Sequence, residues 1–190
     1  MDYQILSASS TAKTKDNWVG PGIYRLTSAV HDGKYLAVDD HNNLVVASGS
    51  QENNDPKQQW QIAYAGKMNL KGDSKEAFVT EFFLINVKTG SYLIDDDNDS
   101  LTMGVSPPTF NGKTRWILVN RRITEKNQAF DDRYIRKNTK DAKELACNGT
   151  EKAEAAKALA CNGTAINFID YVKDEPSNDC QWHIVDNIAE

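Results

Sequence analysis

The sequence predicts an all-β protein built from three copies of a four-strand unit. A tryptophan recurs three times, at Trp60, Trp116 and Trp182, each time beside a short apolar run. A leucine in a candidate strand precedes these tryptophans by 24, 23 and 23 residues. Between leucine and tryptophan come polar turn residues and a second apolar run, which is the pattern of a hairpin. One unit cannot bury its apolar face alone, so three units are expected to pack around a shared core that contains the tryptophans.

The first copy shows the expected elements most clearly. Residues 23–26 alternate apolar and polar and predict an opening strand. Residues 34–37 and 44–46 predict a hairpin around the polar turn 39–43, because Asp and Asn are typical turn residues. Trp60 then lies in the closing strand.

The second copy repeats this order. Its opening strand is expected at residues 82–85 and its hairpin at residues 91–94 and around Leu101. The acidic run 95–99 forms the turn between the two hairpin strands. The closing strand contains Trp116.

The third copy is longer than the others. Its best opening strand is residues 134–136, and its hairpin is expected at residues 157–160 and after the turn 162–164. The segment 143–150 recurs at 157–164, a duplication with a period of 14 residues. The Ala, Glu and Lys residues between the two copies favour a short helix, which we expect to end before Leu159.

These elements define a single domain with one appendage and one insertion. The expected boundaries are an N-terminal extension over 1–20, a domain over 21–188, repeats over 21–66, 76–120 and 121–187, and a partly helical insertion over 141–158.

Composition narrows the class of protein. The chain has 22 basic and 27 acidic residues and a net charge of −5, which argues against a nucleic-acid partner. No run approaches 18 consecutive apolar residues, so we expect no membrane insertion. The three cysteines do not imply a disulfide framework. The first residues lack the basic and apolar regions of a signal peptide, so we expect a cytoplasmic protein or one secreted by a non-classical route.

The first repeat carries a recognisable motif. Gln58-Gln59-Trp60, preceded by the block from Gly33 to Leu36, resembles the ricin-B-like β-trefoil lectins, whose repeats end in Gln-x-Trp. The block from Gly90 to Leu93 repeats the pattern, whereas Thr114 and Cys180 replace the glutamine of the motif in the later repeats. The resemblance implies a β-trefoil and a carbohydrate-binding lectin, of the kind found in many fungi.

The same resemblance shows a departure at the sugar site. The family's better-known site uses an Asp directly after the second-strand leucine of a repeat. This chain has Ala37, Ile94 and Ala160 at those positions. A galactose-type site is therefore lost in the first two repeats and at best altered in the third.

Other polar and aromatic residues of the loops are candidates for a glycan site, because sugars need a flat apolar face and fixed polar groups. The candidates are Asp39, Asp40 and Asn54 in the first repeat, Asp95, Phe110 and Asn111 in the second, and Asn162, Tyr171, Asn178 and Asp179 in the third. The alternative for each Asp and Asn is a purely structural role in a hairpin turn.

No pattern predicts a catalytic residue, a metal site or a cofactor. The acidic run 95–99 fails as a calcium loop, because Ser100 stands where such a loop needs Gly and Ser106 where it needs Glu. The cysteines and His183 lack paired zinc-ligand spacing. No nucleophile elbow, phosphate loop or metalloprotease motif is present, so the sequence predicts a binding protein and not an enzyme.

Two functions remain open at the level of sequence. The first is a lectin whose partners are glycans or glycoproteins. The second is a protease inhibitor that shares the trefoil fold and presents an exposed loop, 48–57 or 106–113, to a cysteine or serine protease. A homodimer is compatible with either function.

Overall fold

The structure is a computed structural model of the 190-residue chain. It describes residues 18–49, 54–70, 77–95, 100–105, 112–125, 128–137, 156–171 and 182–186. The expected N-terminal extension lies outside these residues up to residue 17. The helix expected in the insertion lies outside them as well, up to residue 155.

Six strands form a closed barrel. They are β1 (Gly22–Ser28), β4 (Gln59–Leu70), β5 (Ala77–Asn86), β8 (Trp116–Glu125), β9 (Gln128–Lys137) and β12 (Trp182–Asp186). Each strand pairs antiparallel with the next in this order, and β12 pairs with β1 to close the ring. Every barrel strand therefore has a neighbour on both sides, which removes the exposed edges of an open sheet.

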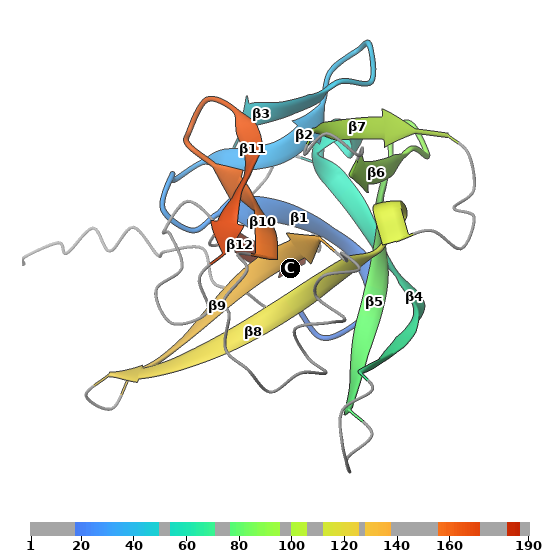
Figure 1. Ribbon diagram of the computed structural model, residues 1–190. Coiled ribbons are helices and arrows are strands. Elements are labelled where there is room, and N and C mark those ends of the chain that lie inside the picture. Colours follow the sequence, from blue (N-terminus) through green and yellow to red (C-terminus); the bar gives the residue numbers. More distant parts are fainter. Residues whose placement is uncertain are drawn as a thin grey trace, which may run out of the picture.

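Three hairpins cover one end of the barrel (Figure 1). They are β2 (Lys34–Val38) with β3 (Leu44–Ser48), β6 (Tyr92–Asp95) with β7 (Leu101–Gly104), and β10 (Ala156–Cys161) with β11 (Ile166–Tyr171). The first strand of each hairpin pairs with the barrel strand that precedes it. A six-strand barrel capped by three hairpins, one from each repeat, is a β-trefoil, so the predicted fold class is confirmed.

The three tryptophans lie in the core, as their spacing predicts. All three are at most 1% exposed. Each indole Nε1 donates a hydrogen bond to the backbone carbonyl of the preceding repeat leucine: Trp60 to Leu36 at 2.9 Å, Trp116 to Leu93 at 3.1 Å and Trp182 to Leu159 at 2.9 Å. The constant leucine-to-tryptophan spacing in the sequence therefore reflects a bond that ties each closing strand to the hairpin of its own repeat.

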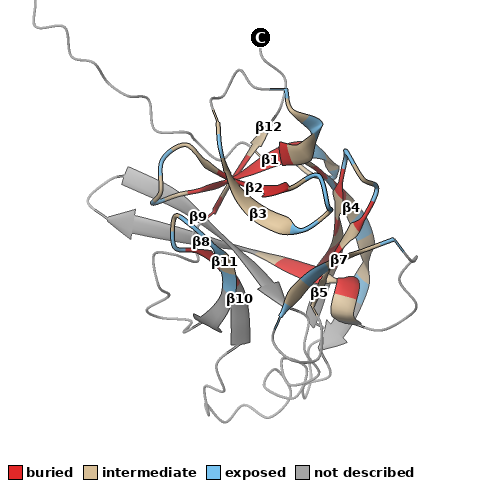
Figure 2. Cartoon of the chain, turned by 90° about the horizontal axis from the view of Figure 1, so that it is seen from above, coloured by how far each residue is buried: buried red, intermediate tan, exposed pale blue. Residues whose placement is uncertain are grey.

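Burial follows the barrel and decreases toward the hairpin turns (Figure 2). Residues 24–28 of β1 are all buried, because this strand has β4, β12 and β2 as neighbours. Strand β3 pairs only with β2 in the described part of the chain, and its residues are half-buried or exposed. The turns of the hairpins are thus the surfaces that the fold offers to solvent.

The barrel strands are longer than the apolar runs predicted. The ribbon of β4 with β5 continues to Leu70 opposite Ala77, and the ribbon of β8 with β9 continues to Glu125 opposite Gln128. Both ribbons project from the barrel on the side away from the hairpins (Figure 1). In the backbone register of the second ribbon, Arg121 lies opposite Asp132 and Ile123 lies opposite Phe130, so charged and apolar positions alternate in its outer part.

The third repeat begins its hairpin earlier than expected. Strand β10 begins at Ala156 and pairs with β11 from Ala156–Tyr171 to Cys161–Ile166. Residues 156–158, which we assigned to the insertion, are therefore strand. β10 thus runs into the second copy of the duplicated segment, 157–164, because the apolar residues Leu159 and Cys161 of this copy enter the core.

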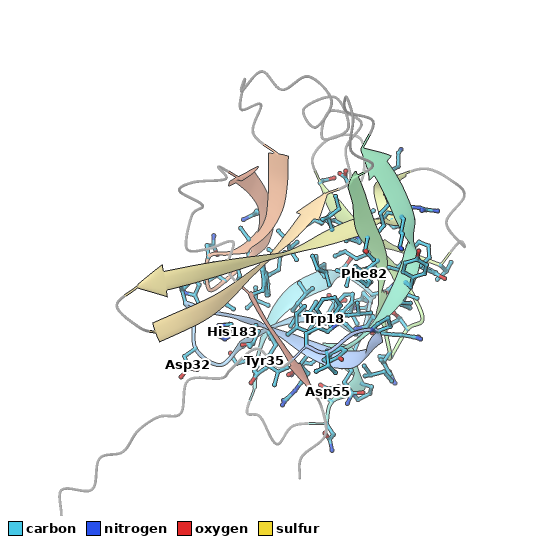
Figure 3. The ribbon with its side chains drawn as sticks, turned by 90° about the horizontal axis from the view of Figure 1, so that it is seen from below. Trp18, Asp32, Tyr35, Asp55, Phe82 and His183 are labelled. Atoms are coloured by element: carbon cyan, nitrogen blue, oxygen red, sulfur yellow. The ribbon has the colours of Figure 1, made fainter. Side chains whose placement is uncertain are left out.

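The first described residues already pack against the barrel. Trp18 contacts Phe82 edge to face, with 5.3 Å between the ring centroids (Figure 3). Tyr24 donates its hydroxyl hydrogen bond to the carbonyl of Gly20 at 2.8 Å. Residues 18–20, which we placed in an extension, are therefore attached to the core.

One ion pair is built into the barrel wall. Arg115 Nη1 lies 2.7 Å from Glu81 Oε2, and the Glu81 side chain is only 5% exposed. The guanidinium also lies over the ring of Phe83, 5.9 Å from its centroid. At Gly66 the pairing of β4 with β5 is interrupted by a bulge, and φ is +144°. A Cβ there would lie 3.0 Å from Arg115 Nη1, so glycine leaves the space that the guanidinium occupies.

Candidate functional site

Asp39 builds the turn between β2 and β3. Its Oδ1 accepts hydrogen bonds from the backbone N–H of His41 at 2.9 Å and of Asn43 at 2.8 Å. Its Oδ2 accepts a third from Asn43 Nδ2 at 2.9 Å. These bonds, the side chain of Asn43 first, hold the pKa of Asp39 below its usual range. The structure therefore gives this candidate the structural turn role that the sequence left open.

Asp40, the next residue, forms an ion pair instead. Its Oδ1 lies 2.7 Å from Lys57 Nζ, and the two side chains are 82% and 31% exposed. The hydrogen bond from Lys57 lowers the pKa of Asp40, and the same bond raises the pKa of Lys57. Both groups are therefore charged at neutral pH and accessible from solvent.

The position of Lys57 is fixed by a short turn of helix. The 3₁₀ turn η1 (Pro56–Gln58) begins after Asp55, whose side chain accepts a hydrogen bond from the backbone N–H of Lys57 at 3.0 Å. Pro56 suits the first helical position because its φ is already helical and it lacks a donor. Gln58, the first residue of the Gln-x-Trp motif, is the last residue of this turn and is buried. Lys57, directly before this motif, therefore contacts Asp40 in the hairpin turn of its own repeat.

Asn54 lies at the edge of this surface. Its side chain is exposed, and its backbone carbonyl accepts a hydrogen bond from Gln59 Nε2 at 3.4 Å. The hairpin turn and the η1 turn together form a polar surface, which we call the first-repeat site and define by Asp40, Asn54 and Lys57. A carboxylate acceptor and an ammonium donor side by side match neighbouring hydroxyl groups of a sugar, which both donate and accept.

The third-repeat candidate Asn162 has a turn role like that of Asp39. Its Oδ1 accepts hydrogen bonds from Thr164 N at 3.0 Å, Thr164 Oγ1 at 3.0 Å and Ala165 N at 2.9 Å. Asp39 and Asn162 each follow the repeat leucine by three residues, so the two repeats use the same turn chemistry.

The remaining candidates are only partly placed. Asp95 ends β6, is half-buried and pairs with Leu101. Tyr171 ends β11 opposite Ala156, and its side chain lies outside the described part. Phe110, Asn111, Asn178 and Asp179 lie outside the described residues. Among the ten candidates, the first-repeat group is therefore the one that the structure brings together, and it adds Lys57, whose only sequence signal was its place three residues before Trp60.

The described residues contain no group of three or more His, Cys, Asp or Glu side chains that could hold a metal ion. His31 packs its imidazole against the backbone of Gly163 in the turn after β10. In the ranges that the structure describes, no helix is long and apolar enough to cross a bilayer.

Comparison with known proteins gives structural matches only. No protein-family model matches the chain, and no curated protein sequence matches it. One matching structure is the Polyporus squamosus lectin bound to a human-type influenza-binding epitope, with a TM-score of 0.53 at 16% identity. A second structure, the PSL1a–E64 complex, has a TM-score of 0.56 at 14% identity.

Another matching structure is the designed three-fold symmetric protein ThreeFoil, with a TM-score of 0.52 at 17% identity. The match covers 86% of this chain and 98% of ThreeFoil. For the Polyporus lectin and PSL1a the figures are 88% of this chain and 50% and 48% of theirs. This chain thus spans about half the length of those two proteins. At these identities the matches establish the β-trefoil fold.

Proposed function

We propose that this protein is a glycan-binding lectin and that it binds sugar at the first-repeat site. The observation that carries the proposal is the Asp40–Lys57 ion pair, which joins the β2–β3 turn to the η1 turn while keeping both charges accessible. Both turns are braced by their own hydrogen bonds, through Asp39 and Asp55, so the pair is held in place before any ligand arrives. Such preorganisation lowers the entropic cost of binding.

The fold and the sequence support this proposal from two other directions. The solved structure of the Polyporus squamosus lectin, a trefoil neighbour, holds the glycan epitope Neu5Aca2-6Galb1-4GlcNAc. The Gln-x-Trp motif of the first repeat resembles the ricin-B-like lectins of fungal type, and Lys57 of the first-repeat site directly precedes that motif. In this proposal the protein acts by binding, without catalysis.

The chemistry follows from the pair itself. Lys57 Nζ donates to one hydroxyl oxygen of a sugar, and the Asp40 carboxylate accepts from the neighbouring hydroxyl. Hydrogen bonds to charged groups are stronger than hydrogen bonds between neutral groups. A vicinal diol satisfies both partners at once, so the site favours sugars with two adjacent free hydroxyls.

A glycan array with a concentration series of the protein tests the function. We expect saturable binding that free sugar competes away. Asp40→Ala and Lys57→Met should each weaken the binding about tenfold or more, because each removes a charged hydrogen-bond partner of the sugar. The matched control is Lys34→Met, which removes a lysine of the same hairpin whose Nζ donates to Ser48 Oγ at 2.8 Å. Its affinity should stay within about twofold of the parent.

The alternative function, protease inhibition, is tested with the same concentration series of the protein. The activities of papain and trypsin are measured at increasing concentrations of this protein. The candidate inhibitory loops, 48–57 and 106–113, lie partly outside the described residues. Absence of glycan binding together with tight inhibition of either protease would replace the lectin proposal. Glycan binding that survives both site variants would keep the lectin and remove the first-repeat site.

A further inference from the structure

A cavity lies where the three hairpins meet, and two of its lining residues, Asn42 and Asn43, belong to the same β2–β3 turn as Asp40. It has a volume of about 590 Å³. Nine residues from all three repeats line it: Asn42 and Asn43 from the β2–β3 turn, Leu44 from β3, Ser100, Leu101, Thr102 and Met103 from β7 and the residue before it, and Ile166 and Asn167 from β11. The cavity is therefore assembled only when the trefoil closes.

Each of the three repeats contributes one aliphatic residue, at the same position of its hairpin, to the apolar part of the cavity. Leu44, Leu101 and Ile166 are the first residues of β3, β7 and β11, and each pairs with the last residue of its partner strand. All three are partly buried and pack against the core. Aliphatic side chains that keep part of their surface exposed inside a concave site favour an apolar group of a ligand.

Its polar part consists of amides and hydroxyls. Asn43, Ser100, Thr102 and Asn167 are exposed, and none of the nine lining residues carries a charge. Two of the amides are anchored by other bonds: Asn43 Nδ2 donates to Asp39 Oδ2 at 2.9 Å, as described above, and Asn42 Nδ2 donates to Ser91 Oγ at 2.9 Å. Asn42 also holds a left-handed backbone conformation, with φ +63°.

We propose that this cavity is a second ligand site and that it binds a neutral saccharide carrying an N-acetyl group. A charged ligand would lose hydration without gaining an opposite charge among the lining residues. An acetamido group matches both parts of the lining, because its methyl packs on the three aliphatic residues and its amide donates to and accepts from the asparagine side chains. The volume lies within the range of roughly 300–1,000 Å³ that is typical of small-molecule sites.

This site is separate from the first-repeat site. Asp40, Asn54 and Lys57 do not line the cavity, and no lining residue takes part in their ion pair. We therefore expect ligands to bind independently at the two sites. A substitution that abolishes binding at one site should leave binding at the other measurable.

The test uses the full chain with ¹³C-labelled Leu, Ile and Met methyl groups. The probe is N,N′-diacetylchitobiose, and the matched control is cellobiose, which has the same linkage with hydroxyls in place of the acetamido groups. We expect saturable shifts of the Leu44, Leu101, Met103 and Ile166 methyl signals with diacetylchitobiose and at least about tenfold weaker effects with cellobiose. Equal shifts with both sugars, or none with either, would overturn the proposal.

Substitutions place the binding. Thr102→Arg fills the cavity from its rim and should weaken the binding about tenfold or more, whereas Val105→Arg adds the same side chain just beyond β7, outside the lining, and should leave it within about twofold. Asn167→Asp is a nearly isosteric second variant whose negative charge should weaken the binding as well. Asp40→Ala should leave these methyl shifts unchanged. Unaltered affinity in both Thr102→Arg and Asn167→Asp, or a loss in Asp40→Ala, would refute a separate cavity site.

Discussion

The tryptophan-to-leucine hydrogen bond offers a quantitative test of the threefold design. Substituting Trp60, Trp116 or Trp182 by Phe keeps an aromatic ring in the core and removes the indole N–H together with part of its volume. The lost bond to a buried carbonyl costs about 1–3 kcal/mol. The smaller ring leaves a cavity that adds about 1 kcal/mol. Each substitution should therefore lower the free energy of unfolding by about 2–4 kcal/mol.

Urea denaturation followed by far-UV circular dichroism measures this loss without relying on tryptophan fluorescence. The three variants should agree within about 1 kcal/mol, because the three bond lengths fall between 2.9 and 3.1 Å and all three rings are buried. Trp18→Phe is the control, since Trp18 lies outside the repeated pattern and is half-buried. It should cost about 1 kcal/mol. A core variant as stable as the parent would refute the equivalence of the three repeats.

Three further predictions concern charges and backbone. Arg115→Met should destabilise the fold by about 2–3 kcal/mol in urea denaturation, because it removes the guanidinium that pairs with the buried carboxylate of Glu81, while a double variant with Glu81→Met should recover most of the loss. Gly66→Ala should cost about 1–3 kcal/mol by the same measurement, since φ +144° strains any other residue and the new methyl displaces Arg115. Glycan binding at the first-repeat site should be constant from about pH 5 to about pH 9, since Asp40 loses its charge only below its usual range and Lys57 only above its own. A transition near pH 6.5 in an affinity titration would instead implicate a histidine.

The sign of that pH dependence also holds for stability. The lowered pKa of Asp40 means that its stabilising effect is present above the unfolded value and is lost as the pH falls through the folded value. The raised pKa of Lys57 means that its effect is present below the unfolded value and is lost as the pH rises through the folded one. The ion pair is thus intact across the whole neutral range.

The fold was predictable because its signal is repeated. The spacing from Leu36 to Trp60 recurs in the other two repeats, and the structure shows the hydrogen bond that fixes this spacing. The lengths of the ribbons were not predictable, because charged residues such as Arg121 and Asp132 interrupt the apolar alternation in the outer parts of β8 and β9.

The site was predictable only in part. Asp39 and Asp40 are neighbours of the same residue type, yet one turns its carboxylate to its own backbone and the other to Lys57. Composition cannot distinguish these two roles, because turn geometry decides which side chain returns to the chain. The cavity could not be predicted from sequence motifs, because residues near 43, 102 and 166 come together only when the three hairpins pack on the barrel.

The pairing of β1 with β12 also sets the order in which the chain folds. Residues 24–28 pair with residues 182–186, so the barrel closes only when nearly the whole chain is present. The ribbons β4–β5 and β8–β9 join neighbours in sequence and carry a small loop-closure cost, whereas the closing pair spans the longest loop. During synthesis the edge of β1 that pairs with β12 therefore stays unpaired until residues 182–186 have been made. We expect slow folding, limited by this last, long-range pairing step.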